Sequence, residues 1–438
     1  MGSQGNDVID LFRGHPDPSL LPMSAIAKAS ATVMATPDVR AQAMLYGPDE
    51  GYGPLRQHIA RWLTDFYHPR DPIPADRICI TGGASSNLAC ILQVFTDPIY
   101  TRNVWMVAPT YFLACRMMDD AGFTGRMRGV PEDESGVDLA YLRRELEAAE
   151  EKAEAEGNTE PTHKPPRPWG KIYKHIIYAV PTFSNPSTLT MSLSDRESLV
   201  RLAREFDALI ITDDVYDFLQ WSSDPKKSLA HPDKARLPRI VDVDRYLDGG
   251  PQDDFGNAVS NGSFSKLIGP GTRTGWAEST EKVAWGISQA GSSRSGGAPS
   301  HLAATIIDQL FPTGTFPRFL EESLKPSYAR RYYRLMGAIR EHLLPLGVTL
   351  PTTPEVAGGY FIWVQLPAPL RASELAPVAL QEQKVKVATG NLFQVQGDPS
   401  AGPDDFNRGV RLCFSWEHED RLEEGVRRLA CAVRNALS

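Results

Sequence analysis

Residues 258–276, AVSNGSFSKLIGPGTRTGW, place a lysine among several groups that bind anions. The segment begins as a short apolar strand and then becomes polar at Ser263, Ser265 and Lys266, and Arg273 follows seven residues after the lysine. An amine combined with two hydroxyls and a guanidinium favours a site for an anionic ligand. The simpler alternative is an exposed lysine after a strand, which is how most lysines occur.

The chain upstream of this segment alternates short apolar strands with helical patterns, which predicts an α/β fold with a mainly parallel sheet. The predicted strands are residues 77–81, 104–108, 175–180 and 208–212. Ser194 and Glu197 form a capping-box pattern, which predicts Ser194 as the N-cap of the following helix.

Polar residues stand where these predicted strands end. They are Gly83-Ala84-Ser85, Asn185, Asp213 with Tyr216, and Ser263 to Lys266. Because ligands of open parallel sheets bind at the carboxyl ends of the strands, this placement predicts one shared crevice. The glycine turn at residues 82–87 offers free backbone N–H groups and a helix dipole to a phosphate, although an ordinary strand-to-helix turn has the same composition.

After residue 326 the pattern changes to that of a smaller α+β domain. Its predicted elements are a helix at residues 328–344, a strand at residues 359–366 and a helix at residues 422–437. We therefore divide the chain into three parts. They are an N-terminal segment (residues 1–45) that joins the small domain, a large domain (residues 46–325) and a small C-terminal domain (residues 326–438).

One stretch of the large domain has the composition of a surface insertion. Residues 143–160 carry seven glutamates in a helix-forming context, and Pro161, Pro165, Pro166 and Pro168 follow. This pattern predicts a solvated helix followed by a stiff linker, with a functional acidic patch as the alternative.

Composition excludes several classes of protein. The 438 residues include 46 Lys plus Arg against 54 Asp plus Glu, and this net charge of −8 argues against a nucleic-acid-binding surface. No apolar run approaches the roughly 18 residues that could span a bilayer. The five cysteines form no CxxC pair, so we expect buried thiols in a reducing compartment and no metal site. The N-terminal residues lack the pattern of a secretory signal, which predicts a cytoplasmic protein.

Taken in order, these motifs resemble the class I/II aminotransferases of the aspartate aminotransferase superfamily. The resemblance is closest to the α-aminoadipate and kynurenine-type aminotransferases and their fungal relatives, and it extends from residues 12–18, FRGHPDP, to residues 410–415, VRLCFS. It implies the fold type I of pyridoxal 5′-phosphate (PLP) enzymes, in which a large domain with a mainly parallel sheet carries a smaller α+β domain. It also implies PLP as the cofactor.

The resemblance assigns the ring contacts of the cofactor residue by residue. Lys266 would hold PLP as an internal aldimine and then shuttle the substrate proton, and Asp213 would pair with the pyridinium nitrogen. Tyr216 and Asn185 would hydrogen-bond the ring O3′, and Tyr111 would stack on the ring face. Asn185 as a turn residue, Asp213 as a helix cap and Tyr111 in the core are the structural alternatives.

The resemblance also assigns the contacts of the phosphate and of the substrate. The phosphate would lie among Gly83, Ala84, Ser85, Ser263, Ser265 and Arg273. Tyr46 would reach the phosphate of the other subunit, which implies a homodimer with shared active sites. Arg411 would clamp the substrate α-carboxylate bidentately near Gly14 and Asn185, unless it forms an edge salt bridge.

This chain departs from the resembled pattern at two points. Ala84 stands where the family often has a serine, so the phosphate site has one hydroxyl fewer. Thr389-Gly390 replaces the common Pro-Gly turn, while Phe393 is kept.

The resemblance implies an aminotransferase that moves an amino group between an L-amino acid and a 2-oxo acid. Two alternatives stay open: a lyase on the same scaffold that eliminates a β- or γ-substituent, and a PLP-binding regulatory domain without turnover. Arg13 and His15 lie in the segment that borders the substrate side chain in the aminoadipate-type relatives. A cationic side chain there suits an acidic substrate, although Arg13 could equally point to solvent.

Overall fold

The computed structural model describes residues 8–352, 354–402 and 406–438 and centres on an eight-stranded sheet. The strand order is β2 (Ile78–Thr81), β10 (Gly275–Glu278), β9 (Ala258–Ser263), β7 (Ala208–Asp213), β6 (His175–Ala179), β3 (Val104–Ala108), β4 (Met127–Asp133) and β5 (Gly136–Val137). The five strands from β9 to β4 pair in parallel, whereas β10 and β5 pair antiparallel. The expected α/β fold with a mainly parallel sheet is confirmed.

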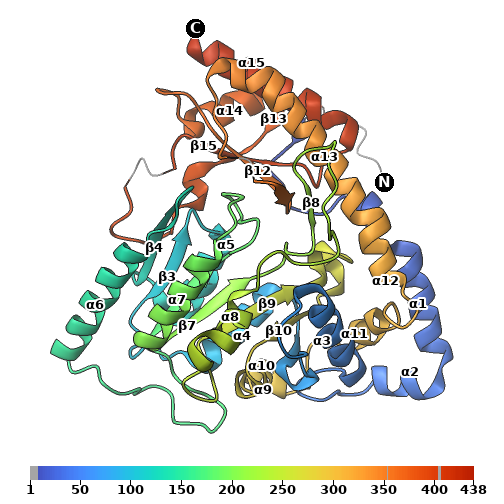
Figure 1. The fold of residues 1–438 in the computed structure, drawn as a ribbon, viewed down its shortest axis with the longest axis vertical. Helices are drawn as coiled ribbons and strands as arrows, with labels where there is room; N and C mark the ends of the chain where they lie inside the picture. The colour runs from blue at the N-terminus through green and yellow to red at the C-terminus, as the bar shows by residue number, and fades with distance from the viewer. Residues whose placement is uncertain (1–7, 353, 403–405) are drawn as a thin grey trace.

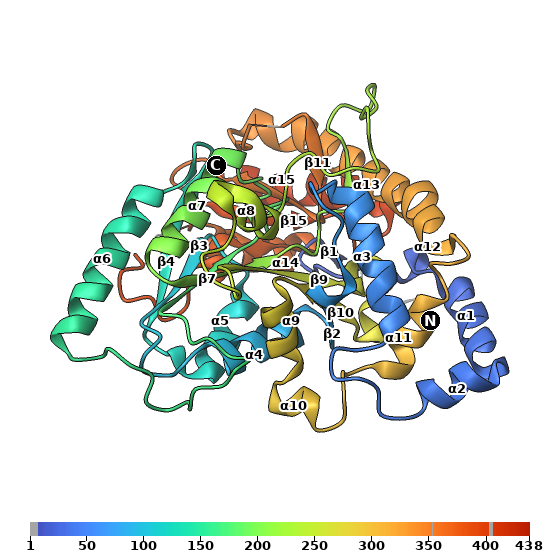
Figure 2. The ribbon, with the colours of Figure 1, turned by 60° about the horizontal axis from the view of Figure 1, so that its bottom comes forward.

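Helices cover both faces of this sheet, which explains why β3, β6 and β9 are buried along their whole length. On β3, Trp105 and Val107 pack toward α6 (Leu139–Ala155), α7 (Leu193–Glu205) and α8 (Ile240–Tyr246). Val104 and Met106 face the opposite way, toward the core that includes α4 (Ala84–Phe95) and α5 (Phe112–Met118). Figure 2 shows α7 and α8 on one side of these strands and α4 and α5 on the other.

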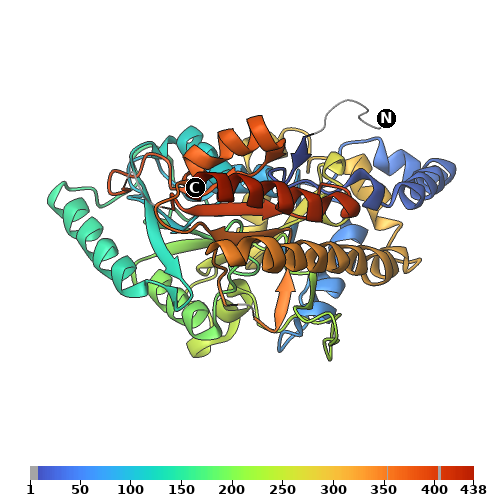
Figure 3. The ribbon, with the colours of Figure 1, turned by 90° about the horizontal axis from the view of Figure 1, so that it is seen from above.

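A second, smaller group of elements covers one end of the central sheet (Figure 1). Its sheet has the order β12 (Phe361–Gln365), β15 (Gly409–Cys413) and β14 (Ala388–Thr389). The helix α15 (Leu422–Leu437) packs against α14 (Ala372–Gln383) and α13 (Lys325–Ala338), and Figure 3 shows α13 and α15 side by side. Near the N-terminus, β1 (Ile9–Asp10) pairs in parallel with β13 (Val385–Lys386). The domain boundaries expected from the sequence stay a prediction.

The start of α7 differs from the expectation. The N-cap is Ser192 and not Ser194, since the Ser192 hydroxyl accepts a hydrogen bond from the Asp195 N–H at 3.1 Å. The Ser192 backbone is extended, with φ −64° and ψ 160°, whereas Ser194 already lies within the first helical turn. The prediction was therefore wrong by two residues, because two serines with acidic residues three positions later compete for the same role.

Residues 143–155 of the acidic segment belong to α6, whereas residues 156–160 and the proline-rich stretch after them contain no helix and only one isolated bridge, Arg167 to Gly170. Most of its glutamates are exposed, but the Glu150 carboxylate contacts Arg102 and Lys174 at 2.7 and 2.8 Å. Among the described residues, no helix is both long and apolar enough to cross a membrane.

Candidate active site

A cavity of about 830 Å³ opens at the carboxyl ends of the parallel strands, where the sequence predicted a crevice. The predicted site residues that line it are Gly14, Ala84, Ser85, Tyr111, Asn185, Asp213, Tyr216, Ser263, Ser265, Lys266, Arg273 and Arg411. Gly83 does not line the cavity itself but lies next to Arg273, which does. Tyr46 does not line this cavity either, and its side chain is 88% exposed.

Lys266 presents a reactive amine to the cavity. It ends a short 3-10 turn, Phe264–Lys266, directly after β9, and its Nζ donates a hydrogen bond to the Gly14 carbonyl at 2.9 Å. Burial lowers the pKa of Lys266 to about 8, and the Arg411 cation contributes in the same direction. A lysine with a pKa this low has an appreciable fraction of neutral amine near neutral pH, as a nucleophile or a base requires.

Asp213 presents the one carboxylate among the described residues that line this cavity. Its Oδ2 accepts a hydrogen bond from the Tyr178 hydroxyl at 3.0 Å, and its Oδ1 accepts one from Asn261 Nδ2 at 3.3 Å. Burial raises the pKa of Asp213 to about 7, although the Tyr178 hydrogen bond opposes this shift. Among the described residues, no cation forms an ion pair with it, so the carboxylate suits a protonated ring nitrogen.

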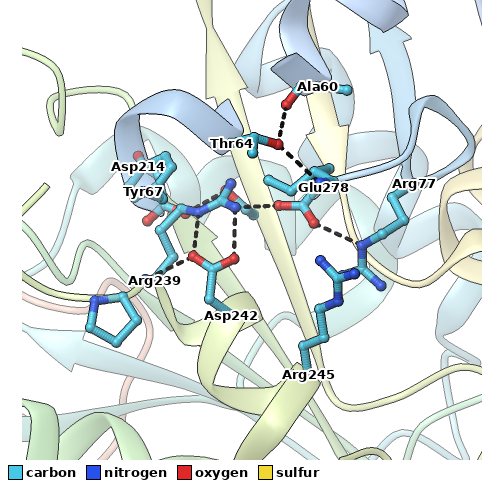
Figure 4. Close-up of polar contacts among 12 residues, drawn as sticks. Ala60, Thr64, Tyr67, Arg77, Asp214, Arg239, Asp242, Arg245 and Glu278 are labelled. Atoms are coloured by element: carbon cyan, nitrogen blue, oxygen red, sulfur yellow. Dashed lines mark hydrogen bonds and ion pairs between the residues drawn. The ribbon is translucent and has the colours of Figure 1, made fainter. Parts of the chain in front are cut away.

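Asp214 turns away from the cavity into a buried polar network (Figure 4). Its Oδ2 accepts hydrogen bonds from the hydroxyls of Thr212 and Ser260 at 2.7 and 2.5 Å. Beside it, the Arg239 guanidinium binds Asp242 and Glu278 through contacts of 2.9 and 2.5 Å. Asp213 ends β7 and Asp214 follows it, and because successive side chains of an extended chain point to opposite sides, only one of the two aspartates faces the cavity.

Arg411 presents donors that a carboxylate can bind. Its Nη1 donates to Asn185 Oδ1 and its Nη2 donates to the Phe12 carbonyl, both at 2.7 Å. Its Nε is buried without a hydrogen-bond partner, and its guanidinium lies 4.0 Å from the centre of the Phe361 ring. An unpaired buried donor is costly, so this arrangement suits a substrate that supplies a carboxylate.

A cradle for a phosphate lies at the N-terminus of α4. Gly83 is the N-cap with φ +96°, and a Cβ there would lie 3.0 Å from Arg273 Nη2. Arg273 Nη2 donates to the Gly82 carbonyl at 2.9 Å, and the Ser263 hydroxyl accepts the Ser265 N–H at 3.1 Å. Backbone N–H groups, hydroxyls and a guanidinium together form the donor set that phosphates prefer.

Two tyrosines that were expected to contact the cofactor ring line the cavity. Tyr111 precedes α5 and lines the cavity, and burial raises its pKa to about 12. Tyr216 is buried, and burial raises its pKa well above the usual value, so the hydroxyl keeps its proton and can donate it in a hydrogen bond.

The structure adds residues that the sequence analysis missed. Tyr178 and Asn261 orient Asp213, and Asn87 donates to Asn261 Oδ1 at 2.9 Å. Lys386 also lines the cavity, from the strand β13. Tyr178 lies within the predicted strand 175–180, where a lone polar hydroxyl among apolar residues was the available signal.

The chain is similar to known proteins over nearly its full length. Residues 7–429 match the family described as aminotransferase class I and II. An uncharacterized protein of Saccharomyces cerevisiae is 34% identical, with 95% of each chain covered. The 2-aminoadipate transaminase of Thermus thermophilus is 27% identical over 100% of this chain and 92% of its own. The crystal structure of Pyrococcus horikoshii kynurenine aminotransferase with PMP is 26% identical, has a TM-score of 0.75, and is matched over 99% of this chain and 92% of its own.

Proposed function

The chain belongs to the class I and II aminotransferase family, and we propose that its cavity performs PLP-dependent transamination with Lys266 as the covalent anchor and base. One observation carries the assignment of these roles. A buried amine with a lowered pKa, a buried carboxylate and a guanidinium with an unpaired donor meet in one cavity. The substrates are an L-amino acid and a 2-oxo acid, as the family implies.

The residues of the cavity fit PLP. Asp213 would bind the ring nitrogen, Tyr216 and the Asn185 amide would donate to O3′, and Tyr111 would pack against the ring. The phosphate would occupy the cradle of Gly83, Ala84, Ser85, Ser263, Ser265 and Arg273. When bound, PLP supplies an electron sink for the bond that breaks at the substrate Cα.

The protein supplies positioning and proton transfer. The Arg411 guanidinium would bind the substrate α-carboxylate and so fix the Cα next to Lys266. Lys266 Nζ would then take the Cα proton and return it on the cofactor side. Gly14 contributes a carbonyl that already holds this amine at 2.9 Å and would keep it near the reacting carbon.

An amino-donor screen with 2-oxoglutarate tests this proposal. We expect single turnovers with an active L-amino acid to convert the bound cofactor to pyridoxamine phosphate and to release the matching 2-oxo acid. S-substituted cysteines serve as the control, because a β-elimination lyase would release pyruvate and a thiol from them. Pyruvate release without pyridoxamine phosphate would contradict transamination.

We also propose a cytoplasmic C2 homodimer that shares its active sites. Met44, Leu45 and Tyr46 are 65%, 69% and 88% exposed in the single chain, and three exposed large apolar residues in a row favour a contact with another chain. In this dimer Tyr46 would bind the phosphate of the partner's cofactor.

The cytoplasmic location is supported by the cysteines. All five are free, which suits a reducing compartment.

Subunit complementation tests the role of Tyr46. Inactive Lys266→Ala chains are mixed with weakened Tyr46→Phe chains, and subunit exchange is verified. In a mixed dimer, the site that keeps Lys266 receives Tyr46 from the Lys266→Ala chain and is fully wild type. We therefore expect the activity per intact Lys266 to rise above that of the Tyr46→Phe homodimer. No rise would show that Tyr46 does not serve the partner's site.

A further inference from the structure

The cavity contains more positive charge than PLP and an α-carboxylate require. Its cationic side chains are Arg13, Lys266, Arg273, Lys386 and Arg411, and Asp213 is the one carboxylate among the described lining residues. The proposed function uses three of these cations: Lys266 for the covalent link, Arg273 for the phosphate and Arg411 for the α-carboxylate. Arg13 and Lys386 are left over.

Of these two, Arg13 already has partners outside the cavity. Its Nε lies 4.0 Å from the Asp10 carboxylate, and its guanidinium stacks 4.7 Å from the centre of the Trp416 ring. Its side chain is also 47% exposed. These contacts direct the charge of Arg13 toward the protein surface.

Lys386, unlike Arg13, has no carboxylate partner among the described residues. In the described part of the chain, no carboxylate lies within ion-pair distance of its Nζ, which instead lies 4.8 Å from the centre of the Phe12 ring. Asp10 pairs with Lys386 in the strand register, but the Asp10 carboxylate accepts the N–H groups of Phe12 and Arg13, both at 2.9 Å. Lys386 is therefore half-buried in the cavity wall, with the Phe12 ring beside its ammonium and no ion pair to a carboxylate among the described residues.

The strand register sets Lys386 close to Arg411. Ala388 pairs directly with Arg411, and Lys386 precedes Ala388 by two residues, a distance of about 6–7 Å along an extended chain. Lys386 ends β13 and Ala388 begins β14, so only Val387 separates the two strands, and Lys386 and Arg411 line the same cavity. Phe12 connects the two cations, because its carbonyl accepts from Arg411 at 2.7 Å and its ring contacts Lys386.

We infer that Lys386 determines specificity by binding the side-chain carboxylate of a dicarboxylic amino acid and of the matching 2-oxo acid. Such a substrate would place its α-carboxylate on Arg411 and its distal carboxylate on Lys386, with its methylene groups beside Leu113 and Met117 of the same cavity. Each carboxylate would then meet one cation that forms no ion pair with another described residue. This inference rests on the proposed function, since it assumes that Arg411 binds the α-carboxylate.

A matched pair of amino donors tests the inference. L-Glutamate and L-norvaline have the same carbon chain length and differ in the distal carboxylate. We expect Lys386→Met to lower kcat/KM for glutamate by about 10- to 100-fold, as the loss of one charge-assisted contact predicts, and to leave norvaline within about twofold. Lys384→Met, an exposed lysine two residues away, is the control and should change neither value.

Binding provides a second readout that does not depend on turnover. Glutarate and pentanoate, which carry two carboxylates and one, are titrated into the holoenzyme by calorimetry. Glutarate should bind wild type more tightly than pentanoate, and Lys386→Met should remove that preference. If Lys386→Met keeps the glutamate-to-norvaline ratio and the glutarate affinity, or if Arg13→Gln removes them instead, the inference is wrong. Failure of every amino donor with the wild type would instead refute the proposed function.

Discussion

Lys266→Ala should lower kcat/KM for every amino donor by about 10⁴-fold, which is the upper end of what a positioned general base supplies. The variant loses the amine that anchors the cofactor and also the base that moves the Cα proton. Within the described cavity, the other lysine is Lys386, which lies beside Phe12 and not beside Gly14. It therefore cannot take over either role. Steady-state and single-turnover rates measure the loss.

Two controls separate this loss from misfolding. Lys386→Ala removes the other cavity lysine and should keep the single-turnover rate with neutral amino donors, measured without a 2-oxo acid, within about twofold, because Arg411 and Lys266 are untouched. The Lys266→Ala protein should unfold at a temperature close to that of the wild type in its cofactor-free form. Turnover by Lys266→Ala above about one tenth of the wild-type rate would refute the assignment of Lys266.

Asp213→Asn should lower kcat by about 10²–10³-fold, a loss typical of removing one group that stabilises charge in a transition state. A neutral amide cannot balance the charge of a protonated ring nitrogen. Tyr178 and Asn261 would still hold the side chain in place, so the geometry would persist while the charge is lost.

Asp214→Asn is the matched variant, since it makes the same change one residue away. Asp214 is buried, accepts hydrogen bonds from Thr212 and Ser260, and is not among the residues that line the cavity. We expect it to lose about 1–3 kcal/mol of stability, because a buried acceptor is replaced, with kcat within about tenfold. Equal losses of kcat in the two variants would mean that the wrong carboxylate was assigned.

The central sheet could be predicted because its strands have strong local signals. Residues 104–108 and 208–212 are short apolar runs that end at polar residues, and they match β3 and nearly all of β7. A strand buried on both faces needs such a run whatever surrounds it, so local sequence was sufficient. The helix at residues 422–437 was also predicted from a local signal, the periodicity of its own residues.

Contacts between distant segments could not be predicted from local patterns. Arg411 meets Phe12 across 399 residues and Asn185 across 226, so no window of sequence contains either pair. The orientation of Asp213 by Tyr178 and the position of Lys386 beside Phe12 likewise depend on how the strands assemble. The roles of these residues followed from family resemblance or became visible only in the structure.

Borohydride trapping tests the central claim most directly. The wild-type holoenzyme is reduced with borohydride, digested, and mapped by mass spectrometry for the peptide that carries the pyridoxyl group. We predict a single modified peptide with the group on Lys266 Nζ, and we predict that prior incubation with an active amino donor prevents the labelling. A stable pyridoxyl group on any other lysine of the wild-type protein would contradict the assignment of Lys266.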